Sequence, residues 1–558
     1  MKRVFAWILA MLMVLSLTAT AFADTTNVTL TVNGENTGHT YVAYQIFSGD
    51  VNSQHVISNV QWGSGITDGA ALLTALKADT TEIVNSQDAT KVTSMAQEFA
   101  EATDAASVAL KMADWGDNRE RIDYFADFLY KRGFLSDRYS TASETSSKVY
   151  QFSLAPGYYL IKDKDGTVSN TQHDFYTKII IELTANSTVA VKGTVPTVTK
   201  RVSNTLNNNY DEKTTNMLNK VHYYQLTGTI PTNIEDYTTY YYEFVDTLSA
   251  GLDFVQFEEI YLLRNDSSRV YFYKNGDTSV SSALKPQMST GLDANRQLHV
   301  SWDNLKATGF PTLLSSDHII VRYSAKLNAN AVVGSTGTLN EVKLVYSNNP
   351  HANDHGTTVP NDARVYTFGM DLTKIDGATK NEQNPTKLPG AEFILYHNHA
   401  PAEVTGNPIP MYAVVDTNGM ITRWTQTLSE ATVLVTDANG KISVKGLSDN
   451  QGYFLRETKA PSGYNQLGSD IKFQITSYTV DTNDRVSSIV YEANNTTNTL
   501  TGDTAALGMV HVTVENKGGA TLPSTGGMGT TILYIAGGIM VLAAVVLLVT
   551  KKRMANND

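Results

Sequence analysis

The segment GYFLRETKAPSGY, at residues 452–464, has an alternating strand pattern that runs into a turn containing Pro and Gly. A related segment, GYYLIKDKDG, occupies residues 157–166. When the two are aligned on their Gly–aromatic–aromatic–Leu core, Glu457 stands where the earlier copy has Lys162. Because residues two apart share one face of a strand, Glu457 lies on the same face as Tyr453 and Leu455. The pattern therefore predicts a β-domain in which a carboxylate points toward the core.

Short alternating segments separated by Gly, Asn and Pro recur along most of the chain, a pattern typical of β-sandwiches. The length of the chain between its two ends is too great for one core, and we expect domains at residues 24–195, 196–364 and 365–519. The first domain also contains apolar residues at helical spacing. These are Val92, Met95, Ala96 and Phe99, and then Ile122, Phe125 and Leu129. The predicted fold class is mainly β: tandem immunoglobulin-like sandwiches, with an N-terminal α+β domain that carries a helical insertion.

The N-terminus has the pattern of a secretory signal peptide at residues 1–23. Lys2 and Arg3 precede an uncharged apolar run, and Ala21 and Ala23 stand at cleavage spacing before Asp24. The apolar run is short for a membrane span, which needs roughly 20 residues. We therefore expect cleavage and export.

The C-terminus combines LPSTGG at residues 522–527, an uncharged stretch that reaches Thr550, and the basic cluster KKR at 551–553. The uncharged stretch is long enough to cross a bilayer, and the basic cluster would stay on the cytoplasmic side. We assign residues 520–558 to this signal and expect a transient membrane anchor.

Composition excludes several functions. The chain has 55 Asp and Glu residues against 43 Lys and Arg, which argues against nucleic acid as a partner. It has no cysteine, so disulfides, thiolate metal sites and cysteine catalysis are excluded. Neither G-x-S-x-G nor H-E-x-x-H occurs, and we expect no enzyme in the ordinary sense. HANDH at 351–355 and HNH at 397–399 have turn-like surroundings that favour plain loops, so we expect no metal and no cofactor.

Two of the predicted sandwiches direct the same kinds of polar residue toward their cores. In the third domain these residues are Lys374 in GMDLTKID, Glu457 in GYFLRET and Asn516 in HVTVEN. In the second they are Lys200 in TVTKRV, Asp246 in YYYEFVDTL and Asn340 in NEVKLVYSN. A single such residue is usually a polar group at a strand end that reaches water. The repetition of Lys, acid and Asn in the same order favours a shared chemistry.

Burial disfavours the charged forms of lysine and of carboxylic acids, and it shifts both toward neutrality. A neutral lysine is a nucleophile, and a neutral acid can donate to a carboxamide and help to move protons. Held against an asparagine in a dry core, the lysine could form an Nζ–Cγ amide with loss of ammonia, driven by proximity. The alternative is an ordinary buried salt bridge whose hydrogen bonds the asparagine completes.

The same segments resemble known families. LTKID, LPGAEFILY and GYFLRETKAPSGY resemble the collagen-adhesin B-type domain. PTVTK, FVDTLSAGL and NEVKLVYSN resemble the isopeptide-forming fimbrial domain, and YQIFSGD, WGSGI and LAPGYYLIKD resemble the N-terminal domain of shaft pilins. The order of the three is that of a major (backbone) pilin of Gram-positive sortase-assembled pili. The C-terminal signal resembles a cell-wall sorting signal.

This resemblance implies Lys374–Asn516 and Lys200–Asn340 isopeptide bonds. The assisting acids would be Glu457 and Asp246, although the acid of the second domain varies between Asp and Glu in the family. It also implies that a sortase recognises the LPxTG residues, cuts after Thr525 and joins it to an amine. The recognised residues are Leu522, Pro523, Thr525 and Gly526.

The partners implied are pilin-specific and housekeeping sortases, identical subunits, peptidoglycan, and possible accessory pilins and host surface ligands. The localisation implied is the Gram-positive cell wall. The N-terminal domain, which has Lys162 where the third has Glu457, is expected to make no cross-link and to be the softest.

Polymerisation requires an exposed lysine that attacks the acyl-enzyme. The family usually carries this lysine in a YPKN-like motif, which this chain lacks. STVAVKGTVPTVTK stands at the corresponding boundary, and alternation places Val189 and Val191 on one face and Lys192 on the other. Lys192 is therefore the predicted inter-subunit nucleophile. The alternatives are a wall-anchored adhesin or accessory pilin that does not polymerise, and, from a different class, a surface enzyme.

Overall fold

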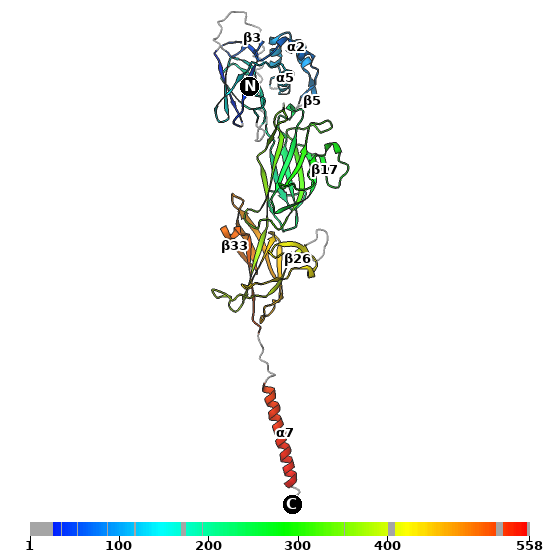
Figure 1. The fold of residues 1–558 in the computed structure, drawn as a ribbon, viewed down its shortest axis with the longest axis vertical. Helices are drawn as coiled ribbons and strands as arrows, with labels where there is room; N and C mark the ends of the chain where they lie inside the picture. Colours follow the sequence, from blue (N-terminus) through cyan, green and yellow to red (C-terminus); the bar gives the residue numbers. More distant parts are fainter. Residues whose placement is uncertain are drawn as a thin grey trace.

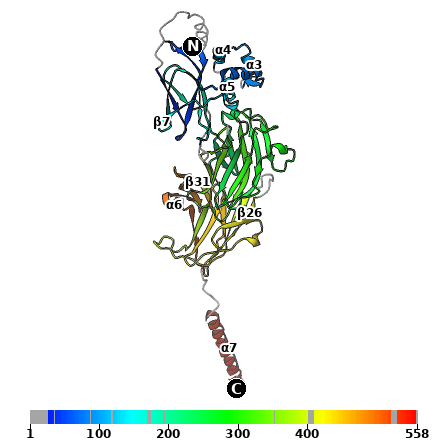
Figure 2. The same ribbon diagram turned by 45° about the horizontal axis from the view of Figure 1, so that its top comes forward.

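The computed structural model describes residues 26–34, 36–52, 54–85, 88–116, 119–168, 175–191, 194–350, 352–399, 408–519 and 528–554. The predicted signal peptide, Lys192 and the LPSTG sequence lie outside these residues. Figures 1 and 2 show β-rich units that follow one another in a row, with one long helix beyond the third unit. The predicted fold class, mainly β with a mixed N-terminal unit, is confirmed.

The first unit combines β-sheets with a group of helices. Its elements are β1 (Val28–Asn33), β2 (Tyr41–Val51), β3 (Ile57–Trp62), α2 (Gly69–Ala78), β4 (Ile83–Asn85), β5 (Asp88–Thr93), α3 (Met95–Glu98), α4 (Ala105–Ala113), α5 (Arg119–Lys131), β6 (Ser140–Thr141), β7 (Ser143–Ser146), β8 (Val149–Leu154), β9 (Gly157–Asp163), β10 (Lys178–Leu183) and β11 (Ser187–Ala190). One sheet has the order β11-β1-β8-β7 and another has β10-β9-β2-β3, with β6 against β2. Figure 2 shows α3, α4 and α5 gathered on one side of this unit.

The predicted helical insertion lies between β3 and β6, with one correction. Phe125 and Leu129 of α5 are buried as the periodicity requires. Val92, however, belongs to strand β5, and helix α3 begins only at Met95. Ser94 caps this helix by accepting a hydrogen bond from the backbone of Gln97, and it thereby fixes where the helix starts. The predicted helical pattern therefore included one residue too many, the β-branched Val92, which precedes the capping residue Ser94.

The middle unit is built from two packed sheets. Its elements are β12 (Val198–Ser203), β13 (Lys213–Thr215), β14 (Val221–Thr229), η1 (Ile234–Asp236), β15 (Tyr242–Leu248), β16 (Leu252–Leu263), β17 (Arg269–Lys274), η2 (Ser282–Leu284), β18 (Gln287–Met288), β19 (Gln297–Trp302), β20 (His318–Leu327), β21 (Thr338–Ser347), β22 (His355–Thr357) and β23 (Asn361–Tyr366). The sheet orders are β12-β14-β20-β16-β17 and β13-β23-β21-β15-β19-β18, with β22 against β21. Both sheets contribute apolar residues to one core, as expected of a sandwich.

The third unit starts directly after the second, since only Thr367 separates β23 from the next strand. Its elements are β24 (Phe368–Asp376), β25 (Glu392–His399), β26 (Ile409–Val415), β27 (Ile421–Thr425), η3 (Leu428–Glu430), β28 (Leu434–Val435), β29 (Lys441–Leu447), β30 (Gly452–Lys459), β31 (Ile471–Val480), β32 (Val486–Ala493), β33 (Thr496–Thr501), α6 (Gly502–Ala506) and β34 (Met509–Asn516). The sheet order β29-β24-β34 packs against β27-β26-β25-β30-β31-β32-β33, with β28 against β25.

The histidine-containing segments are not the plain loops predicted. His397 is a buried member of β25, where it pairs with Met411 and packs edge-on against Trp424 with ring centroids 4.5 Å apart. His355 begins the short strand β22. The turn-forming residues near these histidines were therefore a poor predictor of loops, because strand pairing with distant segments decides the structure here.

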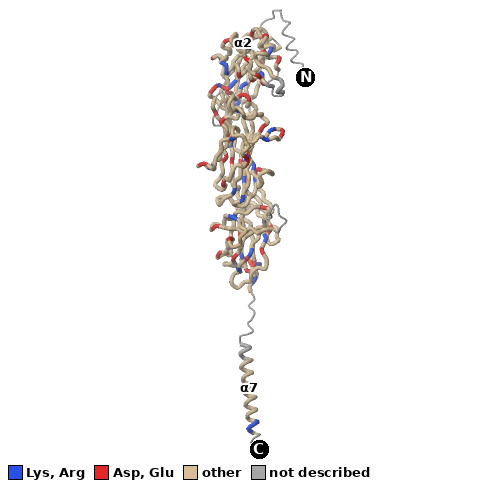
Figure 3. Tube along the Cα trace, turned by 90° about the vertical axis from the view of Figure 1, so that its right-hand side faces the viewer, with Lys and Arg blue, Asp and Glu red and all other residues tan. Residues whose placement is uncertain are grey.

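The long helix α7 (Met528–Met554) ends the described chain. Its segment Leu533–Met554 is long and apolar enough to cross a membrane and is not buried against the rest of the chain. Figure 3 shows a basic cluster near the end of this helix, which the sequence identifies as Lys551–Arg553. The predicted membrane segment with a basic tail is thus present as an exposed helix.

Candidate functional site

The three polar residues predicted in the third unit meet in its core. Lys374 lies on β24 and Asn516 on the neighbouring parallel strand β34. Asn516 is opposite Asp376, two positions beyond Lys374, so both side chains project from the same face of the sheet. Glu457 comes from β30 of the opposite sheet. The sandwich therefore brings lysine and asparagine from one sheet against a carboxylate from the other.

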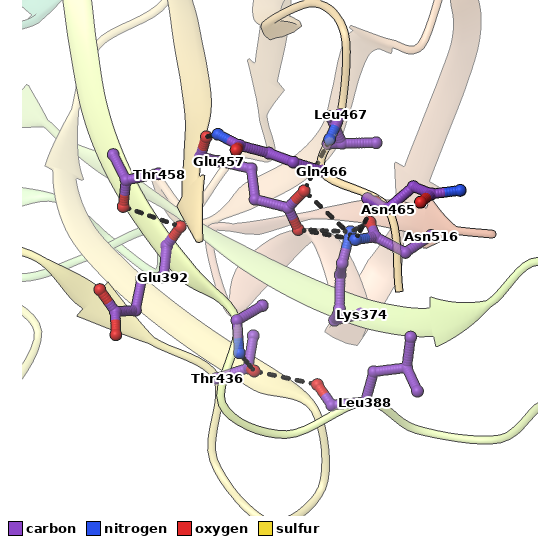
Figure 4. A network of polar contacts seen from close by, with 11 residues as sticks. Lys374, Leu388, Glu392, Thr436, Glu457, Thr458, Asn465, Gln466, Leu467 and Asn516 are labelled. Atoms are coloured by element: carbon purple, nitrogen blue, oxygen red, sulfur yellow. Dashed lines mark hydrogen bonds and ion pairs between the residues drawn. The ribbon is translucent and has the colours of Figure 1, made fainter. Parts of the chain in front are cut away.

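The contacts within this group are direct (Figure 4). The Nζ of Lys374 donates a hydrogen bond to the Oδ1 of Asn516 and lies 3.1 Å from the Oε1 of Glu457. The Nδ2 of Asn516 donates to both carboxylate oxygens of Glu457, at 3.1 and 3.2 Å. Each member of the group thus contacts the other two.

The backbone between β30 and β31 holds the carboxylate and the carboxamide in place. The amide of Leu467 donates to the Oε2 of Glu457 at 2.8 Å, and the carbonyl of Asn465 accepts from the Nδ2 of Asn516 at 2.9 Å. The turn APSGY, at residues 460–464, returns the chain so that these groups face the pair. The sequence that first indicated the fold therefore also builds the site.

The site is dry. Lys374 is 0% exposed, Asn516 is 1% exposed and Glu457 is 3% exposed. Burial lowers the pKa of the Lys374 amine below its ordinary value, although the nearby Glu457 carboxylate opposes this shift. The lower pKa increases the fraction of Lys374 that is neutral and nucleophilic, and this amine lies close to the carboxamide of Asn516.

The predicted residues of the middle unit also converge in a core, with a different division between the sheets. Lys200 lies on β12 of one sheet, whereas Asp246 on β15 and Asn340 on β21 belong to the other. Asp246 is opposite Val342 and Asn340 is opposite Leu248, so the acid and the amide are diagonal neighbours on one face. All three side chains are buried.

Tyr323, on β20, connects the members of this second group. Its hydroxyl accepts a hydrogen bond from the Nζ of Lys200 at 3.2 Å and one from the Nδ2 of Asn340 at 2.6 Å. The same hydroxyl donates to the Oδ1 of Asp246 at 3.1 Å, and Lys200 forms an ion pair with the other carboxylate oxygen. The amine and the carboxamide therefore meet at a shared hydroxyl.

Burial perturbs both charges of the middle group. It lowers the pKa of Lys200 to about 8, against the opposing attraction of Asp246. It also raises the pKa of Asp246 above its ordinary value, which Lys200 opposes in turn. The Oδ1 of Asn340 is buried without a hydrogen-bond partner within the described residues. A buried carbonyl oxygen in this condition is costly, and it is available to a donor during a reaction.

Sequence reasoning did not identify Tyr323. It lies between Val321 and Ala325 on the core-facing side of β20, where an aromatic residue is ordinary packing. Among the 29 tyrosines, Tyr323 is distinguished only by its position opposite Tyr224. The strand of Tyr224, β14, pairs in turn with β12, which carries the buried Lys200. That signal requires the pairing of the strands to be known.

The N-terminal unit places Lys162 in a different setting. Lys162 is 2% exposed, as the alignment with Glu457 predicts for a core-facing position on β9. Its Nζ donates to the Oδ1 of Asp165 at 2.7 Å and to the carbonyl of Asp163 at 3.0 Å. The rings of Tyr130 and Tyr176 lie 4.6 and 5.7 Å from this nitrogen. These contacts satisfy the amine without an asparagine.

Lys192 and the LPSTG residues 522, 523, 525 and 526 cannot be placed, because they lie outside the described chain. Val189 and Val191, just before Lys192, pack against the core of the N-terminal unit as the alternation predicts. Within the residues that the structure describes, no group of three or more His, Asp or Glu side chains is arranged to hold a metal ion.

Family models match two parts of the chain. The SpaA model, a prealbumin-like fold domain, matches residues 371–486, which include Lys374 and Glu457. The LPXTG cell wall anchor motif matches residues 514–556. The chain is also similar to the trypsin-resistant surface T6 protein of Streptococcus pyogenes serotype M6. The two are 23% identical over 423 residues, which cover 66% of this chain and 71% of that protein.

Solved structures of pilins are also similar to this chain. The T6 backbone pilin of Streptococcus pyogenes serotype M6 is 16% identical, with a TM-score of 0.47 over 90% of this chain and 100% of that one. The major pilin SpaD of Corynebacterium diphtheriae is 14% identical, with a TM-score of 0.43 over the same shares.

The anchor match accounts for the C-terminal signal, since its residues include LPSTGG, the exposed apolar helix and the basic end. The SpaA match covers the part of the third unit from residue 371 to residue 486, and the T6 match extends over much of the remaining chain. The chain is therefore a cell-wall-anchored surface protein, and its SpaA domain and its similarity to the T6 surface protein agree with the interpretation of its sequence as that of a major pilin of Gram-positive pili.

Proposed function

We propose that this protein is the backbone subunit of a covalently polymerised pilus, and that Lys–Asn isopeptide bonds stabilise its middle and third units. The observation that carries the proposal is the buried contact of Lys374 with both Asn516 and Glu457. A salt bridge alone does not require a carboxamide in contact with the amine. Formation of an amide bond requires the amine, the carboxamide and the acid together.

In the third unit, the neutral Nζ of Lys374 attacks the Cγ of Asn516. A C–N bond forms, the Cγ–Nδ2 bond breaks, and ammonia leaves. Glu457 contacts both nitrogens, so it can take the proton that the amine loses and return it to the leaving Nδ2. The fixed contact replaces a bimolecular encounter, which supports a reaction that each molecule performs once without a separate enzyme.

In the middle unit, Asp246 holds the corresponding position beside Lys200. The hydroxyl of Tyr323 contacts the amine, the acid and the carboxamide, so it can relay the proton to the leaving nitrogen of Asn340. The unpartnered Oδ1 of Asn340 is where negative charge develops during attack, so it can accept a hydrogen bond as the new bond forms.

Sortase chemistry would join the subunits. Cleavage between Thr525 and Gly526 yields an acyl group on Thr525, which the amine of a second subunit attacks to form an amide. One donor and one acceptor on each subunit give a head-to-tail contact that does not close, hence an open filament. A housekeeping sortase would join the last Thr525 to peptidoglycan. The similar T6 structure is described as a backbone pilin, which supports this role.

Mass spectrometry of residues 24–519, expressed alone, tests the internal bonds. Each bond removes one ammonia, so we expect a mass two ammonia units below that of the unlinked chain. Peptide mapping should recover the peptide of Lys374 joined to that of Asn516, and the peptide of Lys200 joined to that of Asn340. An unshifted mass would contradict both cross-links, and a single loss would assign the bond to one unit.

A further inference from the structure

Among the residues that the structure describes, strand β33 is a free edge of the large sheet in the third unit. It pairs with β32 on one side and ends the sheet order β27-β26-β25-β30-β31-β32-β33. Its sequence, TTNTLT, contains no charge and no proline, and its pairing with β32 runs without a shift in register. Figure 1 shows β33 at the outer side of the third unit. An edge of this kind presents unpaired backbone groups to a further strand.

The other long edges of the sandwich sheets are protected. Among the described edge strands of five residues or more in these sheets, each of the others carries a charge or has an irregular register. Charges occur at Lys178 and Glu182 in β10, Arg201 in β12, Arg269 and Lys274 in β17, Arg423 in β27, Lys441 and Lys445 in β29, and Glu515 in β34. Strand β3 is interrupted by a shift against β2. Charges and bulges are the usual means of preventing edge-to-edge pairing, and β33 has neither.

The exposed face of β33 is a row of threonines. Thr497, Thr499 and Thr501 are exposed, while Leu500 packs against the core of the third unit. Threonine has a high preference for strands, and threonines opposite one another across two strands stabilise the pair. The edge is therefore suited to another uncharged strand with threonines at alternate positions.

We propose that β33 pairs in antiparallel orientation with β33 of a second copy of this protein, with the two-fold axis at Thr499. In this register Thr499 of one copy is opposite Thr499 of the other, and Thr497 is opposite Thr501. Because the paired residues are an even number of positions apart, the core-facing sides of both sheets lie on the same side of the joined sheet. The row of threonines continues across the contact.

The residues around the edge agree with this register. Asp503 lies beyond β33 in helix α6 (Gly502–Ala506), outside the strands that would pair. Asp503 is also paired with Arg485 of its own chain at 2.9 Å. Glu492, on β32, is opposite Thr497 of its own chain, so a full strand separates it from the contact. No like charges meet directly.

Such a contact uses the same surface on both copies and joins two molecules side by side. It needs neither the internal cross-links nor polymerisation. If the chain also forms a fibre, as proposed above, β33 recurs in every subunit, and many weak contacts would act together between two fibres.

Single cysteines can test the register, because the chain contains no cysteine. Each variant is displayed in cells that lack the pilin sortase, so that only monomers are attached to the wall, and is then released with a muramidase and oxidised in solution. Thr499→Cys should form a disulfide-linked dimer, because directly opposite residues in antiparallel strands lie within the Cα distance that a disulfide spans. Thr497→Cys mixed with Thr501→Cys should form a dimer several-fold more efficiently than either variant alone. Thr145→Cys, on the exposed edge β7 beside Glu144, is the matched control.

A charge at the axis provides a second test. Thr499→Lys should reduce the Thr497→Cys with Thr501→Cys dimer several-fold, since two ammonium groups would face one another. Dimer formation by Thr499→Cys no higher than by Thr145→Cys would overturn the proposal. So would a disulfide to a different protein, or dimers of Thr497→Cys and Thr501→Cys that Thr499→Lys does not weaken. The mass shift from internal bonds is measured separately, so failure here leaves the proposed function untouched.

Discussion

The Nζ of Lys374 lies 3.1 Å from the Oε1 of Glu457, although neither side chain is exposed to solvent. A buried ion pair is weak evidence for stability, because desolvation offsets much of its attraction. Here the same carboxylate also accepts two hydrogen bonds from the Nδ2 of Asn516. The position of Glu457 therefore fits a proton carrier between two nitrogens better than a partner for one charge.

Replacing Glu457 tests this role. Glu457→Ala should fold but lose the Lys374–Asn516 bond, because no other acid side chain among the described residues contacts the two nitrogens. The measured mass of this variant should then fall below its own calculated mass by one ammonia and not by two. Glu430→Ala removes an exposed carboxylate of the same unit, and its measured mass should still fall two ammonia units below its calculated mass. A Lys374–Asn516 peptide recovered from Glu457→Ala would make Glu457 a structural residue only.

Loss of the bond should also lower stability. The cross-link closes a span of 142 residues. By analogy with disulfides, closing a span of this length stabilises a domain by roughly 5 kcal/mol through chain entropy. Asn516→Ala, which keeps Glu457 but cannot form the amide, should therefore unfold at a clearly lower temperature in calorimetry. A transition temperature equal to that of the wild type would show that no bond had formed in either protein.

Alternation alone was enough to find the third-unit site. Lys374, Glu457 and Asn516 each stand two positions from buried apolar residues, and that spacing directed them inward. It could not show which sheet each strand joins, and the two units differ in this respect. Lysine and asparagine share a sheet in the third unit but face one another across the middle unit. Tyr323 was missed for the same reason, since its role depends on a pairing between distant strands.

In the middle unit, the roles of the Asp246 carboxylate and of the Tyr323 hydroxyl can be tested separately. Asp246→Asn should abolish the Lys200–Asn340 bond, because it removes the group that accepts the proton of the amine. Tyr323→Phe keeps the ring but removes the hydroxyl, so the bond should form more slowly without being lost. Mass measured at intervals after secretion distinguishes the two. Equal and complete bond formation in both variants would assign the chemistry to another group.

The lowered pKa of Lys200 predicts how the unlinked middle unit responds to pH. Asn340→Ala prevents the bond and leaves the amine buried. Because its pKa in the folded state is about 8, below the ordinary value, the unfolded chain binds more protons between about pH 8 and pH 10. The free energy of unfolding should therefore rise with pH in this window. Lys200→Met with Asn340→Ala lacks the amine, and its denaturant midpoint should not show the same rise. Identical pH profiles would contradict the shift.

The N-terminal unit should be the first to be digested. Lys162 is satisfied by Asp165 and by aromatic rings, and no cross-link is proposed there. Units without a covalent closure open more often and expose their trypsin sites. Limited trypsin digestion should remove this unit and leave a fragment that begins near the middle unit. In Glu457→Ala the third unit should become sensitive as well. Early cleavage within the middle or third unit of the wild type would reverse the predicted order.

The proposed joining of subunits rests on Lys192 and Thr525, whose roles are predicted from the sequence. Val189 and Val191 pack inward at the end of the N-terminal unit, so alternation directs the following lysine outward at the boundary with the middle unit. Thr525 precedes Gly526 in the matched anchor motif. One outward amine and one sortase-activated carbonyl on each subunit are sufficient for an open chain of subunits.

Lys192→Ala should therefore abolish the ladder of high-mass species in cell-wall extracts while leaving both internal bonds intact, because it removes the proposed attacking amine and changes neither of the proposed cross-linking groups. The monomer should still reach the wall, since Thr525 remains. Lys220→Ala, a change at a lysine on the middle unit, is the control and should keep the ladder. A ladder that persists in Lys192→Ala would mean that another lysine performs the attack. If the wild type, expressed with its pilin sortase, forms no ladder, the protein is a wall-anchored adhesin or accessory pilin that does not polymerise.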